Sequence, residues 1–129
     1  TGIKPEQLIQ AALECQINKE KIKLLELLEK EKVKFSDIKL GRLNIFIDIV
    51  NELDVEQLKE LLIFFTGLSC SPDNIRIDFH SYNSFFKGHL CSNGLDIPLT
   101  SGYESSPIEQ YDTKEKLKTV LLNSLAFKQ

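Results

Sequence analysis

The fold is decided by residues 86–98, which read Phe-Lys-Gly-His-Leu-Cys-Ser-Asn-Gly-Leu-Asp-Ile-Pro. Apolar and β-prone residues lead into a polar Ser-Asn-Gly turn, and a short apolar segment closed by Pro98 leads out of it. This pattern predicts strands within residues 85–90 and 95–99. Cys91 falls on the loop between them, where its thiol is placed to meet another molecule.

Upstream of this stretch, the sequence predicts one more strand and the helix before it. Residues 75–79 alternate apolar and polar side chains, which is typical of a half-buried strand. Before them, Asp54 and Gln57 have the spacing of a capping box at a helix start. Gly67 is expected to end that helix in the left-handed conformation.

The N-terminal part of the chain has the apolar spacing of amphipathic helices. Residues 6–16 predict a first helix, and Asn18 is expected to cap a second over residues 19–34. A third helix is expected over residues 38–53, with Ser36 as its cap. The sequence therefore begins with several helices before any strand.

The C-terminal part predicts a connection and then a closing helix. Residues 100–112 are rich in Ser, Gly, Pro and Tyr, which is typical of a loop. The last helix is expected to start near a Thr113 cap and to bury apolar residues such as Leu117 and Leu121. Helices, a small β-sheet and a closing helix define the α+β class.

Composition limits the classes of function. The chain has 129 residues, enough for one domain or one lobe of a larger module. Its net charge of −3, with lysines and glutamates interleaved, predicts no binding to nucleic acid or to a membrane. The longest apolar run, residues 61–65, is too short to span a bilayer, and no signal peptide is recognised. We expect a cytoplasmic or nuclear protein.

The cysteines and histidines predict no metal site. Cys15, Cys70 and Cys91 are widely spaced, without the C-x-x-C pairs of structural zinc sites. His80 and His89 add two scattered ligands at most. Reduced thiols and no metal or other cofactor are expected.

Two stretches resemble the C-terminal lobe of HECT ubiquitin ligases. Residues 89–98 are similar to the family motif His-Thr-Cys-Phe-Asn-Arg-Leu-Asp-Leu-Pro, whose cysteine carries ubiquitin as a thioester. Residues 61–67, Leu-Leu-Ile-Phe-Phe-Thr-Gly, resemble a helix end that the family writes as Leu-Leu-x-Phe-Val-Thr-Gly. Both stretches and the closing helix come in the order expected for that family.

The resemblance implies a HECT C-lobe-like catalytic domain over residues 41–129. Residues 1–40 would be a helical N-terminal extension or a segment between two lobes. Cys91 would accept ubiquitin from a ubiquitin-conjugating enzyme and pass it to a lysine of a substrate protein. The lobe that recruits the conjugating enzyme is absent from this chain.

The resemblance also nominates polar residues that support Cys91. His89 would lie on the same side of an extended strand as Cys91 and could polarise the thiol; the alternative is a structural histidine that donates to a backbone carbonyl. Asn93 is expected to hold the turn by an Asx-type hydrogen bond. Asp96 would either orient the incoming lysine or cap a backbone turn.

Apolar residues are expected to contact ubiquitin. Leu95 and Ile97, together with the closing helix, would form a surface patch. Phe127 lies close to the C-terminus, as does a phenylalanine that the family uses in ubiquitin transfer.

The sequence departs from the family motif at three positions. Leu90 replaces a threonine, and Ser92 and Gly94 replace a phenylalanine and an arginine. The connection over residues 100–112 is also longer than in the family. These departures keep two alternatives open: a catalytically inactive HECT-like protein-interaction module, and an adaptor domain unrelated to the family.

Overall fold

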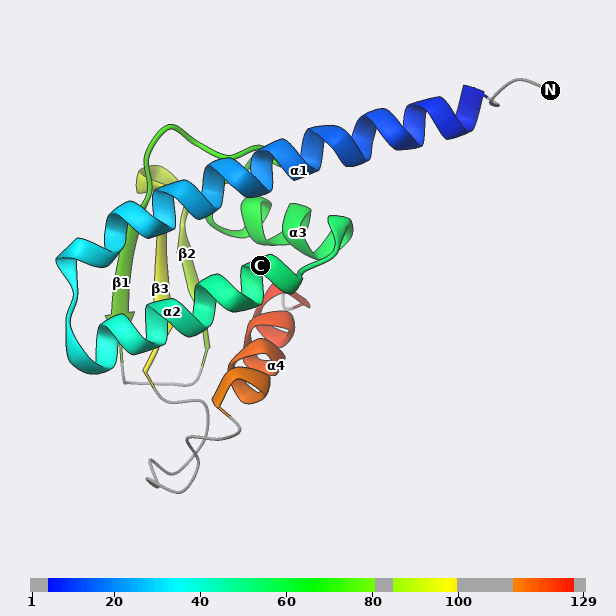
Figure 1. Ribbon diagram of the computed structural model, residues 1–129. Coiled ribbons are helices and arrows are strands. Elements are labelled where there is room, and N and C mark those ends of the chain that lie inside the picture. Colours follow the sequence, from blue (N-terminus) through cyan, green and yellow to red (C-terminus); the bar gives the residue numbers. More distant parts are fainter. Residues whose placement is uncertain (1–4, 81–84, 100–112, 127–129) are drawn as a thin grey trace.

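A computed structural model describes residues 5–80, 85–99 and 113–126 of the chain (Figure 1). The helices and strands are α1 (Pro5–Glu31), α2 (Asp37–Glu52), α3 (Val55–Thr66), β1 (Arg76–His80), β2 (Lys87–His89), β3 (Gly94–Pro98) and α4 (Thr113–Ala126). Two short 3-10 turns, η1 (Lys32–Lys34) and η2 (Leu90–Ser92), complete the order. The expected α+β class is confirmed. The predicted connection over residues 100–112 lies outside the described residues.

The first two predicted helices form a single continuous helix in the structure. α1 runs from Pro5 to Glu31 without a break, so the expected cap at Asn18 is wrong. Asparagine is only a weak helix former, and in the middle of a helix its cost is small beside the burial of a neighbour such as Ile17. Asn18 itself is exposed, which lets its side chain remain in water.

α2 begins without the predicted side-chain cap. Ser36 is the N-cap residue in an extended conformation, but its hydroxyl makes no capping hydrogen bond. Asp37 follows with a positive φ of 53°, a conformation that aspartate tolerates better than most residues. Gly41 lies inside this helix. Apart from its chain neighbours and the helix's own backbone, no atom of the described residues lies within 4 Å of where a β-carbon at this position would be.

α3 has both of its predicted end signals. The Asp54 carboxylate accepts a hydrogen bond from the Gln57 backbone N–H at 2.8 Å, and the Gln57 side chain accepts from the Asp54 N–H at 3.1 Å. Gly67 ends the helix with a φ of 82°, and its N–H donates to the Ile63 carbonyl. The predicted capping box and left-handed terminator are confirmed.

The sheet has the order β1-β3-β2, so β3, the last strand in the sequence, is central. β1 is parallel to β3 and places Ile77 opposite Leu95. β2 is antiparallel to β3 and places Gly88 opposite the same Leu95. The tight turn η2 therefore connects an edge strand to the centre of the sheet.

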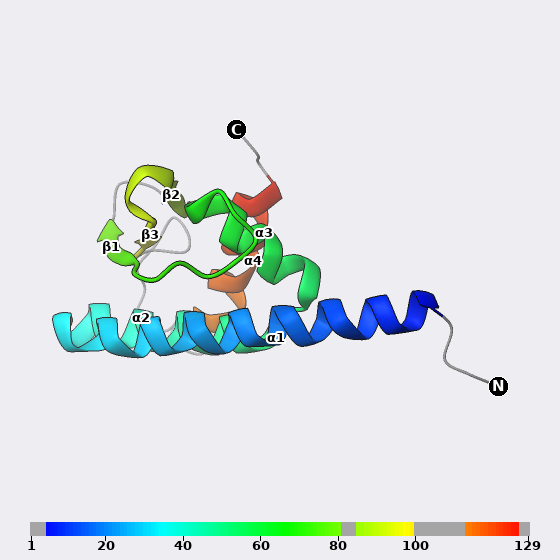
Figure 2. The same cartoon turned by 90° about the horizontal axis from the view of Figure 1, so that it is seen from above.

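The helices cover one face of the sheet, and α1 and α2 lie side by side beneath it (Figure 2). Because side chains alternate along a strand, Ile77, Leu95 and Ile97 point to the covered face. Asp78 and Lys87, which are exposed, point to the other face. The sheet is therefore apolar toward the helices and polar on its opposite side.

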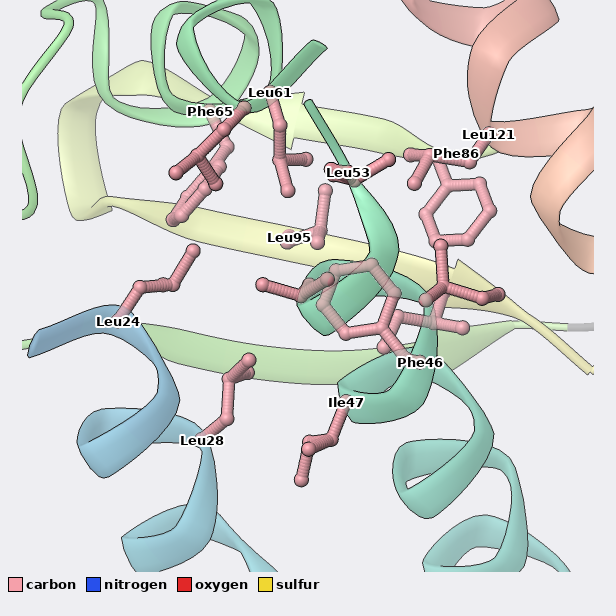
Figure 3. Packing of buried hydrophobic residues seen from close by; sticks show 14 of the residues in the cluster. Leu24, Leu28, Phe46, Ile47, Leu53, Leu61, Phe65, Phe86, Leu95 and Leu121 are labelled. Carbon is pink, nitrogen blue, oxygen red and sulfur yellow. The ribbon is translucent and has the colours of Figure 1, made fainter. Parts of the chain in front are cut away.

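One hydrophobic core joins all parts of the domain. Figure 3 shows Leu24 and Leu28 of α1, Phe46 of α2 and Phe65 of α3 around Leu95 of β3. Each such side chain stabilises the fold by about 1.5–3 kcal/mol when fully buried. The second half of α1 is therefore integral to this core. That residues 1–40 join two lobes stays a prediction.

Within the described residues, no helix is both long enough and apolar enough to cross a membrane.

Candidate functional site

Cys91 lies at the middle of η2, between β2 and β3, and is exposed. The turn closes at Asn93, whose φ of 51° places it in the left-handed region. Asparagine visits this region more readily than most residues, which explains its place before Gly94. The predicted position of Cys91, on a loop between two strands, is confirmed.

This turn contacts residues 67–76 on both of its sides. On one side, the Leu90 side chain lies over Gly67, 3.8 Å from where a β-carbon of residue 67 would be. On the other side, the Arg76 backbone N–H donates to the Asn93 carbonyl at 3.2 Å. Leu90, immediately before Cys91, therefore packs beside Gly67, and Asn93, two residues after Cys91, is held by a backbone hydrogen bond.

His89 is bonded to Asp96 rather than to a backbone carbonyl. Its Nε2 lies 2.8 Å from the Asp96 Oδ2, so the partner of this nitrogen is a carboxylate and not the backbone carbonyl of the structural alternative. The two side chains meet because His89 stands opposite Gly94, two residues before Asp96 on the same face of β3. The Asp96 side chain is 15% exposed and that of His89 33%, so the pair is partly shielded from water. This contact braces the strands on both sides of Cys91.

The side chain of Asn93 reaches away from its own turn. Its Nδ2 lies 3.5 Å from the Asn74 carbonyl oxygen, in the loop before β1, at the outer limit of a hydrogen bond. The expected Asx-type bond is thus replaced by a weak contact with a neighbouring loop. Asn93 shapes the turn through its backbone conformation.

The expected ubiquitin-contacting patch at Leu95 and Ile97 is wrong. Their exposed fractions are 1% and 0%, and both side chains belong to the core. The alternation of Leu95, Asp96 and Ile97 puts the two apolar residues on the face that the helices cover. Phe127, the other expected contact, lies outside the described residues.

The exposed apolar residues near Cys91 are different ones, which the sequence analysis did not select. Leu90, next to Cys91, is 57% exposed. Leu68 follows the glycine that Leu90 covers, and Ile63 lies one helical turn before that glycine; both are exposed. The signal available for Leu90 was an apolar residue at the end of a predicted strand, directly beside a cysteine.

A second group missed by the sequence analysis lies over Gly94. A β-carbon at this position would meet the Ser92 Oγ at 3.1 Å, the Arg76 Nη2 at 3.4 Å and the His89 Cβ at 3.4 Å. The Arg76 Nε also forms an ion pair with the Asp78 carboxylate at 3.0 Å. Gly94 therefore lets a guanidinium from β1 lie across the central strand, at the position where the HECT motif has its own arginine. Because β1 and β3 come from distant segments of the sequence, no local pattern predicts that Arg76 lies close to Gly94.

No group of three His, Cys, Asp or Glu side chains in the described ranges is arranged to hold a metal ion.

A comparison with known protein families finds no match to this chain, and a comparison with curated proteins finds none either. The HECT resemblance therefore rests on the residues quoted above.

Proposed function

We propose that this chain is the catalytic lobe of a divergent HECT-type ubiquitin ligase that carries ubiquitin on Cys91 as a thioester. The observation that supports it most is an exposed cysteine at the tip of a turn that is anchored on both sides. A thiol that must reach the thioester of another protein needs exposure and a fixed position more than it needs a strong base.

The proposed reaction has two steps. In the first, the Cys91 thiolate attacks the thioester carbonyl that links ubiquitin to the conjugating enzyme. A bond to the Cys91 Sγ forms, the bond to the conjugating enzyme's sulfur breaks, and that sulfur leaves as a thiolate. In the second, a substrate lysine amine attacks the new thioester, loses a proton to water and releases Cys91 as a thiolate. The reaction consumes no cofactor.

The His89–Asp96 pair supports Cys91 by holding the two strands together. Since the His89 Nε2 is already bonded to the Asp96 carboxylate, we assign this nitrogen a positioning role and not that of a base for the thiol. The apolar surface for ubiquitin is reassigned from Leu95 and Ile97 to Leu90, with Leu68 and Ile63 as its exposed neighbours.

A thioester trap tests this function. A conjugating enzyme charged with ubiquitin is mixed with the whole protein that carries this chain, and the products are separated on non-reducing gels. We expect a ubiquitin adduct that thiols remove and that Cys91→Ala abolishes. Cys70→Ala is the matched control, because Cys70 is also an exposed free cysteine. No adduct with a folded protein and several conjugating enzymes contradicts the proposal.

The second candidate is a protein-interaction module that keeps the fold without transferring ubiquitin. The exposed Leu90 favours it, because an apolar side chain replaces the hydroxyl that the HECT motif has beside its cysteine. In that case ubiquitin or another partner binds equally well to the wild-type protein and to the Cys91→Ala variant, and no thioester forms.

A further inference from the structure

The Cys91 turn rests on a single segment of the chain. Residues 67–77, which we name the support segment, run from the end of α3 into β1. Its first residue, Gly67, lies under Leu90, and the Arg76 N–H near its other end donates to the Asn93 carbonyl. The support segment therefore contacts the turn on both sides.

The support segment is itself bound to α1. The Glu20 carboxylate accepts a hydrogen bond from the Ser71 N–H at 2.6 Å, and the Glu31 carboxylate accepts one from the Ile77 N–H at 3.2 Å. Figure 2 shows the loop between α3 and β1 running between α1 and the turn that carries Cys91. α1 and the turn thus meet through this loop.

The contacts from α1 differ in strength. Hydrogen bonds to a charged carboxylate are about twice as strong as those between neutral groups, and Ser71 is buried. The ion pair between Lys23 and Asp73, at 3.2 Å, joins two exposed side chains, and such pairs contribute little. Glu20 is therefore the stronger of the two links to the loop before β1.

We infer that Glu20 of α1 is a positioning residue for Cys91, acting through Ser71 and the support segment. Its carboxylate fixes the Ser71 backbone, the segment fixes Leu90 and Asn93, and these two residues hold the turn. The effect of Glu20 on ubiquitin loading rests on the proposed function. The contacts that lead from Glu20 through Ser71 to the turn do not depend on that function. α1 thereby becomes part of the reactive site, although no residue of α1 belongs to the turn.

Hydrogen exchange and thioester loading test the inference in three variants of the whole protein that carries this chain. Glu20→Ala removes the acceptor, Glu20→Gln keeps an acceptor oxygen, and Lys23→Ala removes only the exposed ion pair. In Glu20→Ala we expect amide exchange in residues 87–95 and at Arg76 to rise at least about threefold, with exchange in α4 unchanged. Lys23→Ala should resemble the wild type, and Glu20→Gln, which keeps a neutral and therefore weaker acceptor, should lie between the wild type and Glu20→Ala.

Loading provides the functional measurement. We expect the rate at which Cys91 accepts ubiquitin to fall about tenfold in Glu20→Ala and to recover in part in Glu20→Gln, since a misplacement of about 1 Å can cost about 100-fold. Unchanged exchange at the turn, or an equal rise in α4, overturns the inference. A local rise in exchange without any fall in loading overturns the role in the reaction. If the wild type does not load, the proposed function fails, and exchange alone decides whether Glu20 holds the turn.

Discussion

Gly88 of β2 lies directly against the Phe64 carbonyl near the end of α3. A β-carbon at position 88 would overlap the Phe64 carbonyl oxygen and would lie 3.0 Å from its carbonyl carbon and 3.1 Å from the Phe65 Cα. All of these atoms belong to the backbone of a helix, which cannot move aside as a flexible side chain can. The absence of a side chain at Gly88 lets the strand before Cys91 pack on α3.

Gly88→Ala should therefore destabilise the fold by about 1–3 kcal/mol, the usual cost of overpacking. Gly41→Ala is the matched control: the position lies inside α2 with open space around it, so alanine should stabilise by about 0.5–1 kcal/mol. Urea denaturation of the two variants and the wild type measures both changes. Equal effects of the two substitutions would contradict the close approach of β2 to α3.

The elements that the sequence predicted correctly are those with local signals. Asp54, Gln57 and Gly67 act on backbone groups within one turn of themselves, so their roles in α3 follow from their spacing. Asn18 has an equally local signal for a helix start, but the packing of α1 against α2 and α3 overrides it. A local signal decides an element only where no larger burial competes with it.

No short motif in the sequence indicates how the strands of the sheet pair, and this limited the prediction of the site. Cys91 was placed correctly because a turn between two strand-like stretches is visible in the sequence. The alternation of Leu95, Asp96 and Ile97 also indicated that both apolar residues share one face, but not that the helices cover this face. The proximity of Arg76 to Gly94 depends on β1 pairing in parallel with β3, which links segments that no short motif connects.

Glu31 should protect the outer edge of β1. Its Oε1 accepts from the Ile77 N–H, its Oε2 pairs with the Lys34 Nζ at 2.6 Å, and the side chain is buried. Glu31→Ala leaves a buried N–H without an acceptor, which costs about 1–3 kcal/mol, and frees a strand edge for pairing with a second copy. Urea denaturation and sedimentation measure the two effects.

Glu29→Ala is the control for this prediction. Glu29 lies on the same helix and pairs with Lys32 at 3.0 Å, but this pair is at the surface and contributes little. We expect Glu29→Ala to match the wild type in both stability and sedimentation. A Glu31→Ala variant with the same stability as Glu29→Ala would show that Glu31 does not hold the Ile77 N–H.

The ion pair between α2 and α4 should make stability depend on pH. A hydrogen bond from Lys114 at 2.6 Å holds the pKa of Glu52 below its usual value, and the same bond raises the pKa of Lys114. The contribution of Glu52 is thus fully present above the pKa of the unfolded chain and is lost as pH falls through the lower folded pKa. The contribution of Lys114 is present below its unfolded pKa and is lost as pH rises through the raised folded pKa.

Glu52→Gln tests this pH dependence. The variant should be less stable than the wild type at pH 7, and the difference should disappear in strong acid, where the wild-type carboxylate is also neutral. Because the pair is at the surface, 1 M salt should shrink the difference at pH 7. Denaturation curves at the two pH values measure it. A difference that is constant with pH would mean that Glu52 acts through packing and not through its charge.

Substitution of Leu95 should affect the stability of the fold, whereas substitution of Leu90 should affect the loading of Cys91. Leu95 is 1% exposed and lies in the centre of the core, so Leu95→Ala should destabilise the fold by about 2–5 kcal/mol. Leu90→Gln changes an exposed side chain and should alter stability by at most about 0.5 kcal/mol. Leu90→Gln should nevertheless slow the loading of Cys91, because it removes both the proposed contact with ubiquitin and the packing of Leu90 beside Gly67. Thermal unfolding and thioester formation, measured on the same preparations, separate the two effects; normal loading by a stable Leu90→Gln variant would remove Leu90 from the ubiquitin-binding surface.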